Sequence, residues 1–331
     1  MNPFEYAHPE TEAEAVEFLN AHNGNTALLA GGTDLISLMK QDVLTPDRVV
    51  DLKNVESLSG ITAADGGVLI GALTTLEELR EHPLTAGYRS LHDVADGIRA
   101  IQVQANGTVG GDLCLLPNCW YFRSGYGLLA KENGKSLPEI GDNRFHAVLG
   151  NAGPAKYVSA SRFAPAGVAW NARVRVVGPK PDREDWRPLD ALFVTPKSER
   201  QGHLALKPGQ FVSHLWLPAA VGFASATYEV LQSEGLDWPL AAAAVTLQTE
   251  LGVVTQARIV LGHVAPVPWK ADSAAAALRG RSVTPETAER IGEMAVADAT
   301  PLSMNEYKVH LAKTAVKRAL LRAADQPEGG L

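Results

Sequence analysis

Cysteine, aromatic residues and long apolar runs are all scarce in this sequence. Two cysteines among 331 residues cannot build a disulfide framework, which favours a reducing compartment. No apolar run approaches the roughly 20 residues that cross a bilayer. The acidic start MNPFEYAHPETEAEA lacks the basic and apolar segments of a signal peptide. We therefore expect a cytoplasmic protein, or a periplasmic one if a partner subunit carries it there.

Basic residues are also in the minority, because 30 Lys and Arg stand against 37 Asp and Glu. The net charge of −7 argues against nucleic-acid binding, which requires a basic surface. The nine histidines show neither HxxxH nor HExxH spacing, so we expect no metal site. A chain of 331 residues is too long for one ordinary core, which predicts two or three domains.

The N-terminal half is predicted to alternate strands and helices in two units, residues 1–55 and 56–204. In the first unit, a capping box in TEAE (11–14) begins a helix, and TALLA and DRVVDL indicate strands. DLISLMK (34–40) indicates a helix capped by Thr33 or Asp34. In the second unit, GVLIGAL, VAWNARVRVVGP and LDALFV contain predicted strands, and TTLEELREHP contains a helix that ends before Pro83.

Residues 115–158 show no sustained periodicity and are rich in Gly, Pro and Asn, which predicts an irregular insertion. From residue 205 to 325, QFVSHLWLP, ATYEVLQ and the apolar run 241–265 predict an antiparallel sheet that is followed by helices. The last helix, 305–323, has a basic face that we expect to be solvated, made of Lys308, Lys313, Lys317 and Arg322. Residues 326–331 are predicted to be a flexible tail.

Two glycine turns, AGGTDL (30–35) and NGTVGGDL (106–113), form the main candidate site. A glycine turn that leads into a helix presents backbone N–H groups, and these can hold phosphate oxygens. Either turn alone is as easily an ordinary turn, but the two together suit a diphosphate held from two sides. Neither contains the Lys-Ser/Thr of a phosphate loop or the GxGxxG fingerprint, which argues against a nicotinamide-binding Rossmann fold.

The ordered set FEYAHPETEAEAVEFL, LLAGGTDL, RVVDL, VLIGALTTLEEL, NGTVGGDL and VLGHVAPVPWKADSAAAAL resembles a known family over nearly the whole chain. It is similar to the flavoprotein (medium) subunit of molybdenum hydroxylases, which include xanthine dehydrogenase, carbon monoxide dehydrogenase and aldehyde oxidoreductases. The resemblance implies an α+β fold, with a two-subdomain FAD-binding fold of the vanillyl-alcohol-oxidase (PCMH) type and a C-terminal α+β domain.

The resemblance also implies a role and a cofactor. Such a subunit takes electrons from the [2Fe–2S] clusters of a small subunit, in a complex with a large molybdenum-cofactor subunit, and passes them through FAD to an external acceptor. It implies no catalytic acid, base or nucleophile in this chain. The residues implied to bind FAD are Leu29, Ala30, Gly31, Gly32, Thr33, Asp34, Leu35, Thr74, Ala105, Asn106, Thr108, Val109, Gly110, Gly111, Asp112, Arg162 and Val212.

Several of these residues also have an ordinary structural interpretation. Asp34 and Asp112 could each cap a helix or bind the ribityl or ribose hydroxyls of FAD. Trp238 could cover the flavin ring or belong to a core. The aromatic and basic cluster WYFR (120–123) could face the flavin or the electron-donor subunit, or form a small satellite core.

The sequence departs from the family pattern at three places. Relatives often have Asp after the Ser of an S-D-x-A/N-P element, where this chain has Ser161-Arg162. Many carry Lys or Arg shortly after a tyrosine, where this chain has Glu229, Val230 and Glu234. These departures leave two alternatives open, an assembly subunit that has lost FAD and a stand-alone flavin oxidase of the same fold.

The third departure concerns iron. Some relatives hold a [4Fe–4S] cluster with four cysteines in an insertion at the position of residues 115–158, but this chain has only Cys119 there, with Cys114 before it. Because such a cluster normally takes four thiolates, we expect FAD and no metal in this chain.

Overall fold

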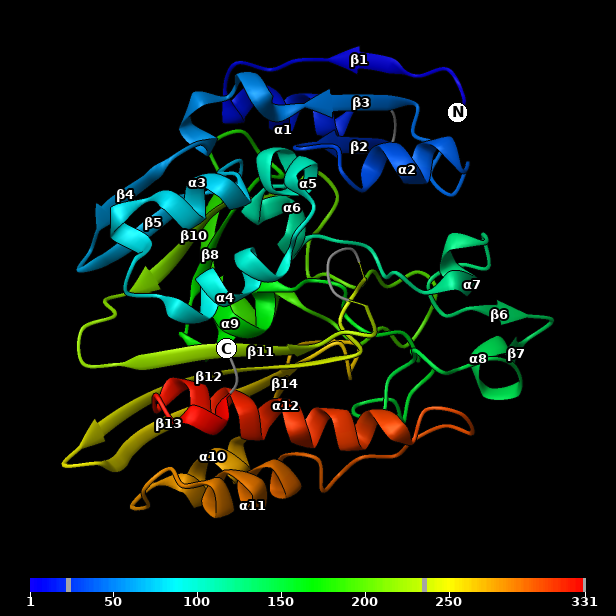
Figure 1. Cartoon of the computed structure of the whole chain (residues 1–331). Coiled ribbons are helices and arrows are strands. Elements are labelled where there is room, and N and C mark those ends of the chain that lie inside the picture. Colours follow the sequence, from blue (N-terminus) through cyan, green and yellow to red (C-terminus); the bar gives the residue numbers. More distant parts are fainter. Residues whose placement is uncertain (22–24, 234–236, 330–331) are drawn as a thin grey trace.

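The computed structural model describes residues 1–21, 25–233 and 237–329 (Figure 1). In these residues three larger sheets follow one another, and a two-stranded sheet lies in the insertion. The first unit is a parallel sheet with the strand order β1 (Glu5–Ala7), β3 (Arg48–Asp51), β2 (Thr26–Leu29). Helices α1 (Glu12–Asn20) and α2 (Leu35–Lys40) belong to this unit. Thr11 caps α1 as predicted, although the Glu14 carboxylate accepts the N–H of Glu10 rather than that of Thr11. The 3-10 helices η2 (Leu52–Asn54) and η3 (Glu56–Leu58) lead to the second unit.

The second unit is an antiparallel sheet with helices against it. The strand order is β4 (Ile61–Ala64), β5 (Gly67–Gly71), β10 (Phe211–Pro218), β8 (Arg173–Val177), β9 (Glu184–Pro188). Its helical elements are α3 (Leu76–Glu81), η4 (Pro83–Thr85), α4 (Arg89–Gly97), α5 (Ile101–Asn106), α6 (Val109–Leu113), α9 (Phe163–Ala169) and η5 (Leu189–Leu192).

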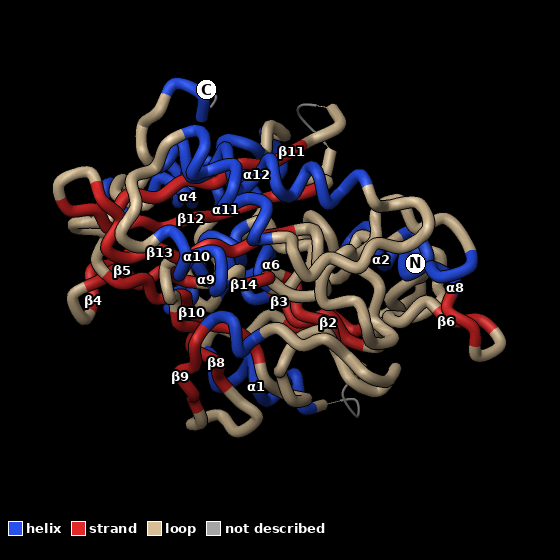
Figure 2. Tube along the Cα trace, turned by 90° about the horizontal axis from the view of Figure 1, so that it is seen from below, coloured by secondary structure: helices blue, strands red, loops and turns tan. Residues whose placement is uncertain are grey.

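The third unit is an antiparallel sheet with the order β11 (Ala224–Val230), β12 (Ala241–Glu250), β13 (Val253–Gly262), β14 (Trp269–Lys270). Helices α10 (Asp272–Leu278), α11 (Pro285–Ala295) and α12 (Tyr307–Ala323) cover one face of it (Figures 1 and 2). The other face packs on the second unit, because Ala244 of β12 and Val260 of β13 belong to the core of that unit. The sheet therefore joins two layers of helices.

The predicted α+β class is confirmed, while three local predictions are corrected. QFVSHLWLP does not begin the last region, because β10 pairs with β5 and β8 in the second sheet. LDALFV is not a strand, since η5 begins there and the strand β9 precedes it. In the predicted flexible tail, Pro327–Gly329 form the 3-10 helix η6, and residues 330–331 lie outside the described residues. We place the boundary of the C-terminal domain between β10 and β11.

The insertion 115–158 contains only short elements, α7 (Trp120–Arg123), β6 (Lys131–Glu132), β7 (Lys135–Ser136) and α8 (Leu137–Ile140). Figure 1 shows it projecting from one side of the molecule, beside the N-terminal end of α12. Polar groups fix it there, since Asn305 donates to the carbonyl of His146 at 3.1 Å and Asn143 donates to the hydroxyl of Ser303 at 2.9 Å.

Lys308 contradicts the prediction of a solvated basic face on α12, because its side chain is only 1% exposed. Its ammonium group donates to three backbone carbonyls, those of Phe145 at 3.1 Å, His146 at 3.2 Å and His263 at 2.8 Å. Burial lowers the pKa of Lys308 to about 7. Lys313 and Lys317 instead pair with Glu289 of α11 near the surface. Lys308 therefore ties α12 to the insertion and to the turn after β13.

We expect Lys308→Met to lower the free energy of unfolding by about 2 kcal/mol, because it removes the donor to the carbonyls of Phe145 and His263, while His146 keeps that of Asn305. Lys317→Met on the same helix is the matched control and should cost less than about 1 kcal/mol. Because the folded-state pKa of Lys308 lies below that of the unfolded chain, the unfolded state binds more protons between pH 7 and pH 10.5. The free energy of unfolding of the wild type should rise with pH relative to the variant in that range. Equal urea-unfolding curves for the two variants would contradict this role of Lys308.

Candidate functional site

The two predicted glycine turns touch one another, although about 75 residues separate them in the sequence. Gly31 follows β2, and Gly107 lies between α5 and α6. A Cβ on Gly31 would overlap the carbonyl oxygen of Asn106 and lie 3.3 Å from the Cα of Gly107. Only glycine therefore allows the first unit to approach the second so closely at this point. The next residue, Gly32, has a φ of +74°, which also favours glycine.

A cleft of about 730 Å³ opens beside this contact. Both turns line it, together with the start of α9 and strand β10. The predicted site residues that line it are Ala30, Gly31, Gly32, Thr33, Asp34, Leu35, Thr108, Gly110, Gly111, Asp112, Arg162 and Val212. The predicted residues that the structure does not place in its lining are Leu29, Thr74, Ala105, Asn106 and Val109. Of these, Thr74 is fully buried and its hydroxyl donates to the carbonyl of Gly60.

The two turns differ in the N–H groups that they offer. In the second turn, Val109 donates to the carbonyl of Thr74, Gly110 to that of Ala72, and Gly111 to the hydroxyl of Thr108. Those three donors are satisfied within the protein, whereas no acceptor among the described residues pairs with the backbone N–H of Thr108. Among the described residues, no acceptor pairs with the backbone N–H groups of Gly31–Asp34 in the first turn. Most of the N–H groups without an acceptor thus belong to the first turn, and the binding of a diphosphate from two sides stays a prediction.

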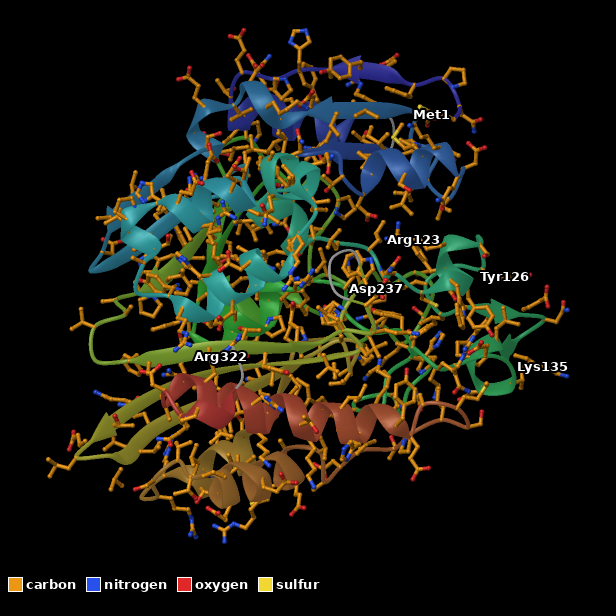
Figure 3. All side chains as sticks on the ribbon, in the orientation of Figure 1. Met1, Arg123, Tyr126, Lys135, Asp237 and Arg322 are labelled. Atoms are coloured by element: carbon orange, nitrogen blue, oxygen red, sulfur yellow. The ribbon has the colours of Figure 1, made fainter. Side chains whose placement is uncertain are left out.

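Asp34 does not cap α2, because its side chain makes no capping hydrogen bond there. Its carboxylate accepts instead from Nη1 of Arg123 at 2.7 Å, and both side chains are mostly buried. Arg123 belongs to α7 of the insertion, so this ion pair closes one end of the cleft. Figure 3 shows Arg123 and Asp237 on the side where the first unit faces the insertion. No spacing in the sequence could have paired Asp34 with a residue so far along the chain.

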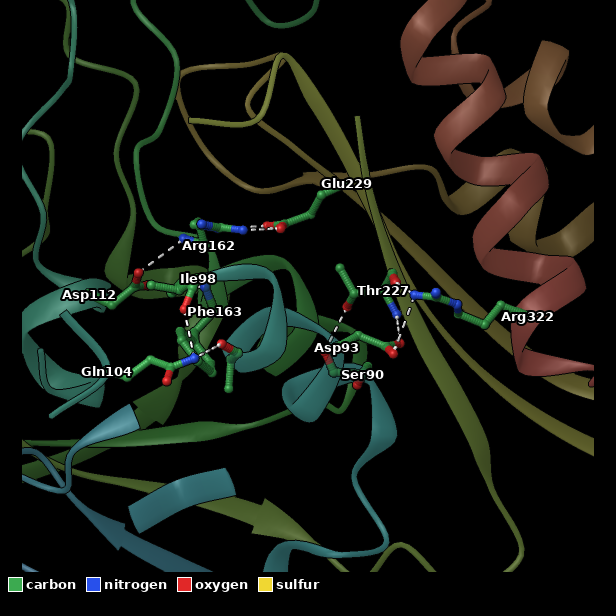
Figure 4. A network of polar contacts seen from close by, with 11 residues as sticks. Ser90, Asp93, Ile98, Gln104, Asp112, Arg162, Phe163, Thr227, Glu229 and Arg322 are labelled. Atoms are coloured by element: carbon green, nitrogen blue, oxygen red, sulfur yellow. Dashed lines mark hydrogen bonds and ion pairs between the residues drawn. The ribbon is translucent and has the colours of Figure 1, made fainter. Parts of the chain in front are cut away.

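Asp112 does not cap α6, which Thr108 caps, and its buried carboxylate binds the start of α9. It accepts from the hydroxyl of Ser161 at 2.5 Å and from the backbone N–H groups of Phe163 at 3.0 Å and Arg162 at 3.3 Å. Figure 4 shows the contact with Arg162. Burial raises the pKa of Asp112, and these hydrogen bonds oppose that shift. Asp112 therefore fixes the segment that carries Arg162 into the cleft wall.

Two of the charged departures from the family pattern, Arg162 and Glu229, form an ion pair with one another (Figure 4). Nε of Arg162 donates to Oε1 of Glu229 at 2.9 Å, and Nη2 donates to Oε2. The two side chains are only 8% and 7% exposed, respectively. Burial raises the pKa of Glu229, and the Arg162 guanidinium opposes this shift. The charge of each residue therefore compensates the charge of the other.

The side chains next to Glu229 in β11 do not face the cleft. Tyr228 and Val230 pack against the core of the third unit, and Glu234 lies outside the described residues. A lysine at position 230 would consequently enter that core rather than approach the cleft. Trp238, which sequence alone left undecided, lines the cleft and is 36% exposed.

The two cysteines lie at or near the cleft. Burial raises the pKa of the Cys114 thiol, which lines the cleft, to about 12. Cys119 contacts Nε2 of His146 at 3.2 Å. In the part of the chain that the structure describes, no group of three or more His, Cys, Asp or Glu side chains could hold a metal ion. In the same part of the chain, no helix is long and apolar enough to cross a membrane.

Two family models match this chain in succession. Residues 2–220 match the FAD binding domain in molybdopterin dehydrogenase, and residues 226–323 match the CO dehydrogenase flavoprotein C-terminal domain. The medium chain of carbon monoxide dehydrogenase from Hydrogenophaga pseudoflava is 26% identical and is aligned over 96% of both chains. The aldehyde oxidoreductase FAD-binding subunit PaoB of Escherichia coli is 28% identical over 98% of this chain and 100% of that subunit.

A solved structure matches as well. It is that of the Hydrogenophaga pseudoflava carbon monoxide dehydrogenase lacking the Mo-pyranopterin moiety of the molybdenum cofactor. The TM-score is 0.75 at 27% identity, and the alignment covers 98% of each chain. The similarity therefore extends over all three units described above.

The Arg162–Glu229 pair can be tested by a double-mutant cycle. Arg162→Met should lower the free energy of unfolding by about 3–5 kcal/mol, because it leaves Glu229 buried without its partner. Adding Glu229→Met should recover most of that loss, since two apolar side chains of similar volume then replace the pair. Chemical denaturation of the wild type, Arg162→Met, Glu229→Met and the double variant measures the cycle. Equal losses in the single and double variants would show that the pair does not carry the coupling.

Proposed function

The chain belongs to the family of FAD-binding domains of molybdopterin dehydrogenases, and we propose that it is the electron-transfer subunit of a molybdenum hydroxylase complex. In this role it accepts electrons from the [2Fe–2S] clusters of a small subunit and passes them on to an external acceptor. A large subunit with the molybdenum cofactor oxidises the substrate. Bound FAD supplies the ability to take up and release electrons singly or in pairs.

The observation that carries this proposal is the cleft at the contact between the two glycine turns. Its volume of about 730 Å³ lies within the range of cofactor sites. The backbone N–H groups of Gly31–Asp34 face no acceptor in the described protein and border the cleft, which fits a group with anionic oxygens such as a diphosphate. The cleft thus fits FAD on its chemistry and its size.

This chain's own residues contribute binding and positioning. Gly31 and Gly32 let the first turn reach the second, and the N–H groups that follow hold phosphate oxygens. The ion pair between Asp34 and Arg123 holds the insertion against the cleft, and the pair between Arg162 and Glu229 closes the wall formed by α9 and β11. Because each cation is paired with an anion, these pairs add no net charge to the wall.

The partners and the compartment follow from the proposed role. We propose a heterotrimer with the large and small subunits, in the cytoplasm, where the thiols of Cys114 and Cys119 stay reduced. A stand-alone oxidase would require a base free to take a substrate proton. Of the three carboxylates that line the cleft, Asp34 and Asp112 are engaged by protein donors, so that alternative would depend on the exposed Asp237.

Purification of the tagged chain from the cells that make it tests the proposed function. We expect flavin absorbance with FAD equimolar to the chain, and a large and a small subunit that copurify with molybdenum and iron. A colourless chain in an intact complex would contradict the electron-transfer role and favour an assembly subunit. A flavin-loaded chain that oxidises a substrate without partners would instead favour the oxidase.

A further inference from the structure

A second cavity, of about 520 Å³, adjoins the FAD cleft. The two share five lining residues, so the second opens onto the first at Ser37, Asn118, Arg123, Asp237 and Trp238. The insertion, His263 after β13 and Lys308 of α12 form most of the rest of its wall, and the remaining lining residues are Gln41, Ala160, Gln232, Pro239 and Leu240. Nothing in the binding of FAD described above uses this cavity.

Three buried polar atoms without a protein partner line this second cavity. They are Nδ1 of His146, the hydroxyl of Tyr157 and Nε2 of His263. The three side chains are only 2%, 3% and 2% exposed, respectively. Buried polar atoms are nearly always hydrogen-bonded, so three such atoms around one cavity call for a ligand that provides their partners.

The backbone of His263 is also unusual, because its φ of +60° lies in the left-handed region. Residues other than glycine adopt this conformation rarely and at a cost, and such residues gather at functional sites. Here the hydrogen bond of 2.8 Å from Lys308 to the His263 carbonyl holds the turn in place. The imidazole is thereby fixed at the cavity wall, with its ring 6.4 Å from that of Trp238.

The charges around the cavity favour an uncharged ligand. Burial lowers the pKa of His263 to about 3 and that of His146 to about 4, so both rings are neutral at physiological pH. Burial raises the pKa of the Tyr157 hydroxyl, so it keeps its proton. Lys308 already donates to three carbonyls, and Arg123 pairs with Asp34. Neither cation is left to pair with a phosphate or carboxylate, although Lys308 contributes positive potential.

The walls are suited to a flat ring, because Trp120, Phe145 and Trp238 line the cavity. We propose that this cavity binds a quinone, the external acceptor to which the subunit delivers its electrons. The ring of the quinone lies between the aromatic side chains, and its carbonyl oxygens accept hydrogen bonds from Tyr157 and the neutral histidines. Two electrons and two protons convert the quinone to hydroquinone, while reduced FAD is oxidised to FAD and gives up the same number of each. This inference rests on the proposed function.

Binding of tetramethyl-1,4-benzoquinone to the oxidised, flavin-loaded complex tests the proposal, because titration calorimetry then reports binding without turnover. We expect one site per chain. Tyr157→Phe should weaken binding roughly three- to tenfold, the effect of one neutral hydrogen bond. Its matched control is Tyr126→Phe, outside the cavity. His263→Leu should also weaken binding, with His203→Leu as the control, because the Nε2 of His203 is likewise buried without a partner.

Flavin content is measured in every protein. Weaker quinone binding with unchanged flavin in the two cavity variants supports the proposal. No quinone binding by the wild type, or equal affinity in all variants, overturns it. Loss of flavin from the cavity variants alone also overturns it, because the cavity then belongs to FAD, while the proposed function survives. A wild-type chain without flavin overturns the proposed function and this acceptor role together.

Discussion

The approach of Gly31 to the carbonyl of Asn106 is the constraint on which the rest of the site depends. Any side chain at position 31 would overlap that oxygen, so the first unit could not reach the second. Because the two units meet there, donors from one unit and the shaped backbone of the other border a single cleft. The contact therefore turns two ordinary-looking glycine turns into one site.

Three buried or half-buried charged contacts then hold the other parts of the chain around that cleft. Asp34 holds the insertion through Arg123, and Arg162 of the second unit holds the third through Glu229. Lys308 fastens α12 to the insertion and to the strained turn at His263. Each contact joins segments that are far apart in the sequence, so the cleft and the neighbouring cavity take their shape from the whole chain.

Local sequence patterns were enough to predict many of the helices, strands and turns. The cap at Thr11 was predictable because neighbouring residues determine it. The placement of β10 was not, because strand pairing across a long connection leaves no local pattern. Most of the predicted site residues line the cleft, since a glycine turn is a local feature. The partners of Asp34, Arg162 and Lys308 could not be predicted, because nothing near them in the sequence specifies a distant charge or carbonyl.

The central claim is that the Gly31 contact creates the FAD site, and the flavin stoichiometry of Gly31→Ala tests it most directly. Gly153→Ala is the matched control, because a Cβ there meets no atom within 4 Å. Both proteins are compared at a temperature where circular dichroism shows them folded. Overpacking of about 1–3 kcal/mol at the contact corresponds to at least roughly fivefold weaker FAD binding. The account predicts that Gly31→Ala loses FAD on gel filtration while Gly153→Ala keeps it, and full FAD retention by folded Gly31→Ala would contradict it.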